Sequence, residues 1–143
     1  MNVETILRNK GSWVATIRPD ATIAEAVEML NRERIGALVV SEDGDSVDGV
    51  LSERDIVIAL GDHGPNLMSR RIDEIMTRKV VTCDPADTVQ ELMAEMTNRR
   101  FRHVPVVKNG RLCGIVSIGD LVKNRLDEVE FEANSLRSFI AGG

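Results

Sequence analysis

The feature that most constrains the fold of this 143-residue chain is an internal repeat. The chain aligns with itself at an offset of 66 residues, which falls to 65 after one extra residue near Ser46. Most of the twelve identities fall at turns and helix caps. The matched pairs are Val14/Val80, Thr16/Thr82, Pro19/Pro85, Thr22/Thr88, Glu25/Glu91, Arg34/Arg100, Val40/Val106, Gly44/Gly110, Gly49/Gly114, Ser52/Ser117, Asp55/Asp120 and Val57/Val122. The repeat predicts two copies of one supersecondary unit, at residues 13–60 and 79–125.

Each copy begins with the same local signals. A short β-rich run, at residues 13–17 or 80–83, ends at a proline turn. A Thr-x-x-Glu motif follows and predicts a capping box that opens a helix. The two motifs are Thr22 with Glu25 and Thr88 with Glu91. Apolar residues at helical spacing come next, so each helix is expected to bury one face.

Two apolar runs follow each of these helices and favour paired strands. The runs are residues 37–40 and 47–51 in the first copy, and residues 104–107 and 112–116 in the second. Asp43-Gly44 and Asn109-Gly110 lie between the runs, which predicts two-residue hairpin turns. A second helix then begins at Ser52 or Ser117. Each copy is therefore predicted to be a β-α-β-β-α unit, and the chain an α+β fold with two small sheets packed against each other.

The segments outside the two copies complete the predicted organisation. We expect an N-terminal helix at residues 1–12, a linker with a short helix at residues 61–78, and a helical extension at residues 126–143. The last helix carries an apolar seam with alternating spacings of four and three residues. Its residues are Val122, Leu126, Val129, Ala133, Leu136 and Ile140. Two interpretations remain open: the helix folds back on its own domain, onto Val3, Ile6 and Leu7, or it forms a homodimer interface.

Composition and charge argue against several classes of protein. The formal net charge of −5 is unfavourable for general nucleic-acid binding. Cys83 and Cys113 have no CxxC spacing and only two histidines accompany them, so no metal site is expected. The sequence contains no run of 18 apolar residues, so no membrane-spanning helix is expected. The first residues lack the pattern of a secretory signal, and we therefore expect a cytoplasmic location. No nucleophile elbow or phosphate-loop motif is present, so we do not expect an enzyme.

The motif Gly-hydrophobic-hydrophobic-Ser-x-x-Asp closes each copy and resembles the cystathionine β-synthase (CBS) domain. It stands at residues 49–55 and 114–120. The segments at residues 73–77 and 100–107 are also similar to that family. The resemblance covers the chain apart from its first dozen residues and its tail. The chain therefore resembles a free-standing pair of CBS repeats, often called a Bateman module, without a catalytic domain to regulate in cis.

The resemblance implies a sensor that binds adenine nucleotides in two clefts between the copies. AMP is the first expectation, with ADP, ATP or NAD(H) as other candidates and S-adenosylmethionine as the ligand of some members. Asp55 and Asp120 match the family position that hydrogen-bonds ribose hydroxyls. Ser52 and Ser117 match a hydroxyl position near the phosphate. An unidentified partner protein is expected to respond to the bound ligand.

The resemblance also implies how the phosphate and the base are bound. Arg102 and His103 match a basic pair that faces nucleotide phosphates. Their counterparts in the first copy, Gly36 and Ala37, carry no charge, so the clefts should be unequal unless Arg54 supplies a cation. The other candidates are Thr16 and Thr82, where backbone groups read the adenine edge in relatives, and Ile35, Val81 and Val104, which are expected to sandwich the base.

Each of these residues also has a plainer interpretation. Ser-x-x-Asp is a variant of the capping box, and one residue can both cap a helix and contact a ligand. The cluster Arg99 to His103 fits a solvated helix end, where cations favour the C-terminal dipole. It also fits a nucleic-acid reader, which we regard as the less favoured function. A structural dimerisation module with empty clefts remains an alternative.

Overall fold

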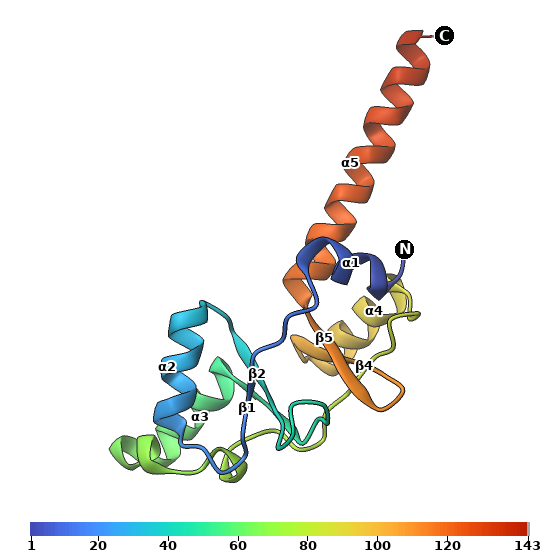
Figure 1. Ribbon diagram of the computed structural model, residues 1–143. Coiled ribbons are helices and arrows are strands. Elements are labelled where there is room, and N and C mark those ends of the chain that lie inside the picture. Colours follow the sequence, from blue (N-terminus) through green and yellow to red (C-terminus); the bar gives the residue numbers. More distant parts are fainter. Residues whose placement is uncertain (143) are drawn as a thin grey trace.

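The computed structural model describes residues 1–142 and shows two lobes, one for each repeat, with a long helix that extends away from the second (Figure 1). The first lobe contains β1 (Thr16–Ile17), α2 (Ile23–Glu33), β2 (Ala37–Val40), β3 (Gly49–Ser52) and α3 (Glu53–His63). The second contains α4 (Val89–Arg99), β4 (His103–Lys108), β5 (Arg111–Ser117) and α5 (Ile118–Gly142). The N-terminal helix α1 (Val3–Lys10) and the 3-10 helices η1 (Gly64–Ser69) and η2 (Ile72–Glu74) complete the element order. The predicted α+β pair of repeats with a helix at each end is confirmed.

Each repeat contributes one small sheet, and a loop contact links the two sheets. In the first sheet β1 pairs in parallel with β2, which pairs antiparallel with β3. The second sheet is the antiparallel pair of β4 and β5. The loop after β2 reaches the second sheet, where the Leu112 N–H donates to the Asp45 carbonyl at 2.7 Å. This contact helps to hold the two sheets together.

The strand predicted at residues 80–83 is reduced to a single bridge between Cys83 and Val106. The Cys83 N–H donates to the Pro105 carbonyl at 3.0 Å, and the Val107 N–H donates to the Cys83 carbonyl at 2.8 Å. The next parallel pair would need an N–H at Pro105 for the Val81 carbonyl, and proline has none. The pairing therefore stops at Cys83 and leaves residues 79–82 outside the sheet.

One of the two predicted hairpin turns is correct. Asn109 and Gly110 form a two-residue turn with φ values of 53° and 77°, which the left-handed region of a type I′ turn requires. The two-residue turn predicted at Asp43-Gly44 is wrong, because β2 and β3 are joined by the longer loop of residues 41–48. The Asp43 carboxylate accepts hydrogen bonds from the N–H groups of Ser46 and Asp45 in this loop. These bonds hold the pKa of Asp43 well below its usual range.

The two lobes have separate apolar cores. The first is built around fully buried residues of α2, β2, β3, η1 and η2. The second unites α4, β4, β5 and the base of α5 with Val3 and Ile6 of α1, so the N-terminal helix belongs to the second lobe. Leu67 and Ile72 are fully buried in the first core, and α3 continues to His63. The segment between the repeats is therefore packed against the first lobe over much of its length.

The helix caps follow the sequence motifs with one exception. Thr22 and Glu25 form the complete capping box at α2. At α4 the Glu91 N–H donates to Thr88 Oγ1 at 3.2 Å, but the Thr88 N–H donates no return bond to the Glu91 side chain. The complete box predicted at Thr88 is therefore wrong, and the threonine side chain alone caps the helix.

The helix α5 leaves the second lobe and extends well beyond it (Figure 1). The interpretation in which this helix folds back on Val3, Ile6 and Leu7 is wrong. Only its base, at Leu121, joins Val3 and Ile6 in the second core, and the seam stays exposed. Leu126 is 63% exposed and Ile140 is 70% exposed. The chain therefore leaves an apolar helical face uncovered.

Two further features bear on the classes of function. Within residues 1–142 no helix combines the length and apolar character that a membrane crossing requires. Across the same residues no group of three or more His, Cys, Asp or Glu side chains is arranged to hold a metal ion. Both cysteines are free thiols, and burial raises the pKa of Cys83 to about 12.

Candidate binding cleft

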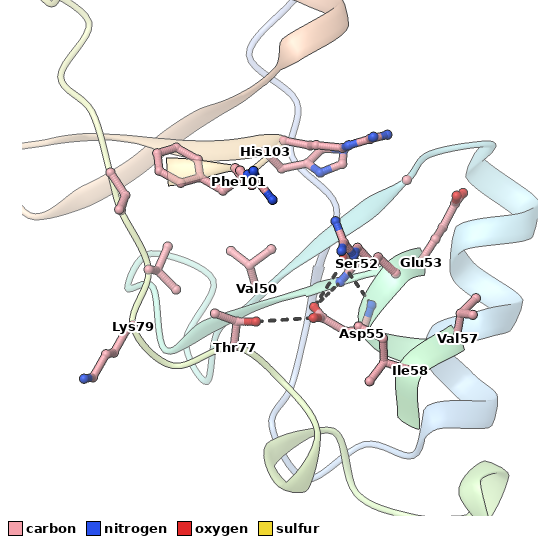
Figure 2. Close-up of a pocket in the computed structure, with 16 residues that line it drawn as sticks. Val50, Ser52, Glu53, Asp55, Val57, Ile58, Thr77, Lys79, Phe101 and His103 are labelled. Carbon is pink, nitrogen blue, oxygen red and sulfur yellow. Dashed lines mark hydrogen bonds between the residues drawn. The ribbon is translucent and has the colours of Figure 1, made fainter. Parts of the chain in front are cut away.

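A cleft with a volume of about 760 Å³ opens between the two lobes (Figure 2). Its walls come from β3 and the start of α3, from the segment after η2, and from the turn between α4 and β4. The lining residues are Gly36, Val50, Ser52, Glu53, Arg54, Asp55, Val57, Ile58, Thr77, Lys79, Val80, Val81, Arg100, Phe101, Arg102 and His103. Both repeats therefore contribute residues to this cavity.

The Asp55 carboxylate is fixed in this cleft by the cap of α3. Ser52 ends β3 in an extended conformation, and its N–H donates to Asp55 Oδ2 at 2.9 Å. The Asp55 N–H donates in return to Ser52 Oγ at 3.2 Å. Thr77 Oγ1 donates to the other oxygen, Asp55 Oδ1, at 3.4 Å, and Figure 2 shows this hydrogen bond as a dashed line. The Ser-x-x-Asp motif is therefore a capping box that also points a carboxylate oxygen into the cavity.

Cationic side chains outnumber acidic side chains in the cleft. Arg54 comes from the start of α3, Lys79 from the segment after η2, and Arg100 and Arg102 from the turn into β4. Arg100 has φ 58°, and this left-handed residue ends α4 and redirects the chain into β4. Glu53 and Asp55 are the acidic groups of the lining. The cleft therefore collects cations locally in a chain whose net charge is −5, which favours an anionic ligand.

His103 lies where the two repeats meet. Its imidazole approaches Gly36 so closely that a Cβ at Gly36 would be 3.3 Å from His103 Nε2. Burial lowers the pKa of His103, and Lys10 and Arg102 act in the same direction, against opposing effects of Asp120 and Glu53. The histidine is therefore mainly neutral at pH 7 and lies within the fields of carboxylates from both repeats.

The remaining wall of the cleft is apolar. Val50, Val57 and Ile58 line it from the first lobe, Val80 and Val81 from the segment after η2. Phe101 is the only aromatic residue among the lining residues of the cleft, and the Arg99 guanidinium lies 6.0 Å from its ring centroid. A cavity with a fixed carboxylate, several cations and an apolar wall can bind a ligand that joins a hydroxylated part, an anionic part and a flat apolar part.

Half of the residues predicted from the sequence line this cleft. They are Gly36, Ser52, Arg54, Asp55, Val81, Arg102 and His103. Ile35 instead lines a separate groove between α2 and α3. The side chains of Ala37 and Val104 are buried in the strands, Val104 completely, so neither side chain is accessible to a ligand. Thr16 pairs with Val39 inside the first sheet, and Thr82 is exposed outside the cleft.

Ser117 and Asp120 form the equivalent cap in the second lobe. The Ser117 N–H donates to Asp120 Oδ2 at 2.8 Å, and the Asp120 N–H donates to Ser117 Oγ at 3.1 Å. Lys10 Nζ also lies 2.7 Å from Asp120 Oδ2. Burial raises the pKa of Asp120, but the bonds from Lys10 and the Ser117 N–H outweigh it and lower the pKa overall. The two repeats are therefore unequal, and a lysine from outside the repeats contributes to the difference.

Sequence reasoning missed several lining residues. They are Val50, Glu53, Val57, Ile58, Thr77, Lys79, Val80, Arg100 and Phe101. Arg100 and Phe101 directly precede the predicted Arg102, so their position next to it could have identified them. Thr77 is brought to the cleft by its bridge to Val50, a contact between residues 27 positions apart that no local sequence pattern indicates.

Comparison with known proteins places these features in a family. The family model of the CBS domain matches residues 14–62 and 72–127. A CBS domain-containing mitochondrial protein of Arabidopsis thaliana, CBSX3, is 35% identical over 137 residues. That match covers 93% of this chain, which spans 66% of the length of the plant protein.

Solved structures show the same fold. The crystal structure of a CBS-domain containing protein from Agrobacterium tumefaciens matches with a TM-score of 0.84 and 45% identity, over 87% of this chain and 99% of that one. The CBS domain pair of protein MJ0100, solved in complex with 5′-methylthioadenosine and S-adenosyl-L-methionine, matches with a TM-score of 0.77 and 28% identity. This second match covers 90% of this chain and 98% of that one.

Proposed function

Because this chain belongs to the CBS domain family, we propose that it is a sensor module that binds an adenine nucleotide in the cleft between its repeats. CBS domains are in general regulatory modules without catalytic activity. The proposed output is a change in the arrangement of the repeats or of two subunits, which a partner protein detects. Such a change requires that the ligand binds one arrangement more tightly than the other.

The observation that carries this proposal is the position of Asp55 relative to the cations. The carboxylate is held by Ser52 and has an oxygen directed into the cleft, where vicinal ribose hydroxyls can donate to it. A phosphate placed against this carboxylate would be repelled, so it belongs with Arg102 and the other cations of the lining. The apolar wall is left for the base. One ligand that joins these three parts is a nucleotide.

The proposal also covers which base and how many phosphates the ligand carries. The ligands bound by the MJ0100 pair both contain adenosine, which supports an adenosine moiety in this cleft. We propose AMP as the first candidate and ADP, ATP and NAD(H) as further candidates. Four cations face two carboxylates in the lining, and this excess supports a phosphorylated ligand over free adenosine.

The exposed seam of α5 favours a second role, which is compatible with the first. Val122, Leu126, Val129, Leu136 and Ile140 are all exposed on one face of this helix. A three-heptad apolar seam is not stable in water alone, and a second copy of the chain can cover it. We propose that the protein is a homodimer through this seam.

Thermal-shift measurements test ligand binding directly. The protein is heated with AMP, ADP, ATP, NAD(H), S-adenosylmethionine or GTP in separate series. A ligand that binds the folded state raises the melting temperature in proportion to the logarithm of its concentration above the dissociation constant. We expect adenine ligands to raise it and GTP to have a smaller effect. No shift with any adenine ligand at millimolar concentration would refute the proposed function.

A further inference from the structure

The surface of α5 is divided into a face that contacts the body and a face that does not. Leu121 is fully buried in the second core, and Asn124 contacts Met1. The Glu128 side chain is only 18% exposed. Because residues three and four apart share a helical face, these three residues define the side of the helix base that packs on the lobe. The seam begins at Val122 and lies away from that side.

Charged residues flank the seam in a fixed order. Leu126, Ala133 and Ile140 occupy the first apolar heptad position, and Val122, Val129 and Leu136 occupy the second. Along the helix, the flanking positions carry two cations, then two anions, then one cation and Phe139. The charged residues are Lys123, Arg125, Glu130, Glu132 and Arg137. In the monomer Arg125 contacts Glu128 on its own helix at 3.0 Å, while no ion pair is formed by Glu130, Glu132 or Arg137 within residues 1–142.

We propose that α5 pairs with α5 of a second copy as a parallel, in-register coiled coil. This inference rests on the dimer proposed above and specifies its direction and register. In a parallel two-stranded coil, flanking charges interact between residues five positions apart on opposite chains. Arg125 then faces Glu130 of the second copy, and Glu132 faces Arg137 of the second copy. Both pairs are attractive, and the two-fold symmetry repeats each of them.

The antiparallel alternatives are less favourable. Full overlap of the two seams places Val122 opposite Ile140, and it also sets Glu130 opposite Glu130 and Glu132 opposite Glu132. Like charges at these positions repel. An overlap that pairs Val122 with Ala133 restores opposite charges, but it leaves Leu136 and Ile140 uncovered. The parallel register alone buries all six apolar layers and matches the charges.

The parallel coil also determines how the bodies are placed. Its two-fold axis runs along the coil, so the second lobe of one copy lies beside the second lobe of the other. Val57 occupies in the first repeat the position that Val122 occupies in the second, and both side chains are exposed. The equivalent helical position is therefore exposed in both repeats.

Charge reversal with rescue tests the register. Glu132→Arg or Arg137→Glu alone should raise the dimer dissociation constant about tenfold, measured by analytical ultracentrifugation over a dilution series. The double variant E132R/R137E should restore it to within about threefold. Residues 132 and 137 are not neighbours on one helix, so rescue must occur between chains. In the partly overlapped antiparallel coil Glu132 faces Arg125, and the double variant would not recover.

Cysteine crosslinking gives an independent measurement. Leu136→Cys in a Cys113→Ser background places identical thiols opposite each other only in the parallel register, and mild oxidation with diamide should yield a covalent dimer. Ser138→Cys, on the outer face of the same turn, is the matched control and should stay largely uncrosslinked. Cys83 is buried and needs no replacement.

The possible outcomes separate the inference from the functions on which it rests. Rescue together with crosslinking at position 136 supports the parallel coil. A dimer that shows neither result overturns the parallel register but leaves the dimer intact. A monomer at all concentrations overturns both. The thermal shift with nucleotides is measured on the same variants, and its presence or absence reports on the cleft alone.

Discussion

Lys10 Nζ lies 2.7 Å from Asp120 Oδ2 and donates a second hydrogen bond to the Ile115 carbonyl at 3.0 Å. Asp55, the equivalent of Asp120 in the first repeat, has no cation at salt-bridge distance within residues 1–142. The helix α1 is thereby tied to the cap of the second repeat. The ion pair is partly exposed, at 34% for the lysine side chain and 25% for the aspartate.

Lys10→Met should lower the free energy of unfolding at pH 7 by about 0.5 to 1 kcal/mol, because a partly exposed ion pair is partly screened by solvent. The pKa of Asp120 is lowered in the folded state, so its stabilising contribution is present above the unfolded pKa of 3.8 and is lost as the pH falls through the folded value. The difference between variant and parent should therefore shrink at about pH 3. Urea unfolding at both pH values measures it, with the exposed Lys108→Met as control. Equal losses at both pH values would contradict the ion-pair explanation.

Asp55→Asn should weaken binding of AMP and adenosine alike, by about 1 to 2 kcal/mol, because it removes a charged acceptor for the ribose hydroxyls. The asparagine oxygen can still accept the hydrogen bond from the Ser52 N–H, so the cap of α3 is retained. Isothermal titration calorimetry measures both affinities. Asp62→Asn changes an exposed carboxylate of the same helix outside the cleft and should leave them unchanged. Unchanged affinity in the Asp55 variant would remove this residue from the proposed site.

Arg102→Ala should weaken ATP and AMP roughly tenfold or more while affecting adenosine little, because the guanidinium is proposed to contact phosphate. Arg111→Ala is the matched control, since Arg111 is exposed at the start of β5 and does not line the cleft. Competition binding with the three ligands measures the ratio. If Arg102→Ala reduced all three affinities equally, its role would be to maintain the cleft rather than to bind phosphate.

Gly49→Ala should lower the free energy of unfolding by about 1 to 3 kcal/mol, the usual cost of overpacking. A Cβ at this position would lie 2.7 Å from Met76 Sδ and 2.8 Å from the Thr77 carbonyl oxygen, and the latter is backbone that cannot rotate away. Gly61→Ala is the control, because it lies within α3 with no atom within 4 Å of the added carbon. That variant should be as stable as the parent or more stable by about 0.5 to 1 kcal/mol. Chemical denaturation compares the two, and similar effects would contradict the steric argument.

His103→Gln should reduce the acid sensitivity of the protein. Burial lowers the pKa of His103 in the folded state, so the unfolded chain takes up the proton first and the free energy of unfolding falls as the pH drops below the ordinary value of 6.5. Urea unfolding of the parent at about pH 7.5 and about pH 5.5 should show this loss, and the variant should show less of it. His63→Gln serves as the control for the second histidine. An identical pH dependence in the parent and His103→Gln would indicate that other groups are responsible.

The sequence predicted the repeated unit well because its signals are local. The caps at Thr22 and Ser52 and the Asn109-Gly110 turn require only neighbouring residues and formed as expected, whereas the box at Thr88 lacks its return bond. The turn at Asp43-Gly44 failed because the side chain of Asp43 organises a longer loop that the dipeptide does not reveal. The strand before Cys83 failed because of Pro105, a residue more than twenty positions away.

The difference between local signals and long-range contacts also explains which residues of the cleft were predicted. Asp55 and Arg102 were predicted because the repeat and the family motif mark their positions. Lys10 and Thr77 lie outside the predicted repeats and reach Asp120 and Asp55 only through tertiary folding. No periodic pattern or motif in the sequence connects such pairs, so their roles required coordinates.

The equivalent glycines of the two repeats are each covered by a segment that precedes the other repeat. Gly49 is covered by Met76 and Thr77, whereas Gly114 is covered by Leu7 of α1. The segment that precedes each repeat therefore packs on the other repeat, so each repeat depends on chain that lies outside it in sequence. Cleaving the chain after residue 60 would strip the first half of its cover and leave the N-terminal helix on the wrong fragment. The pair, not the single repeat, is therefore the smallest unit that we expect to fold independently.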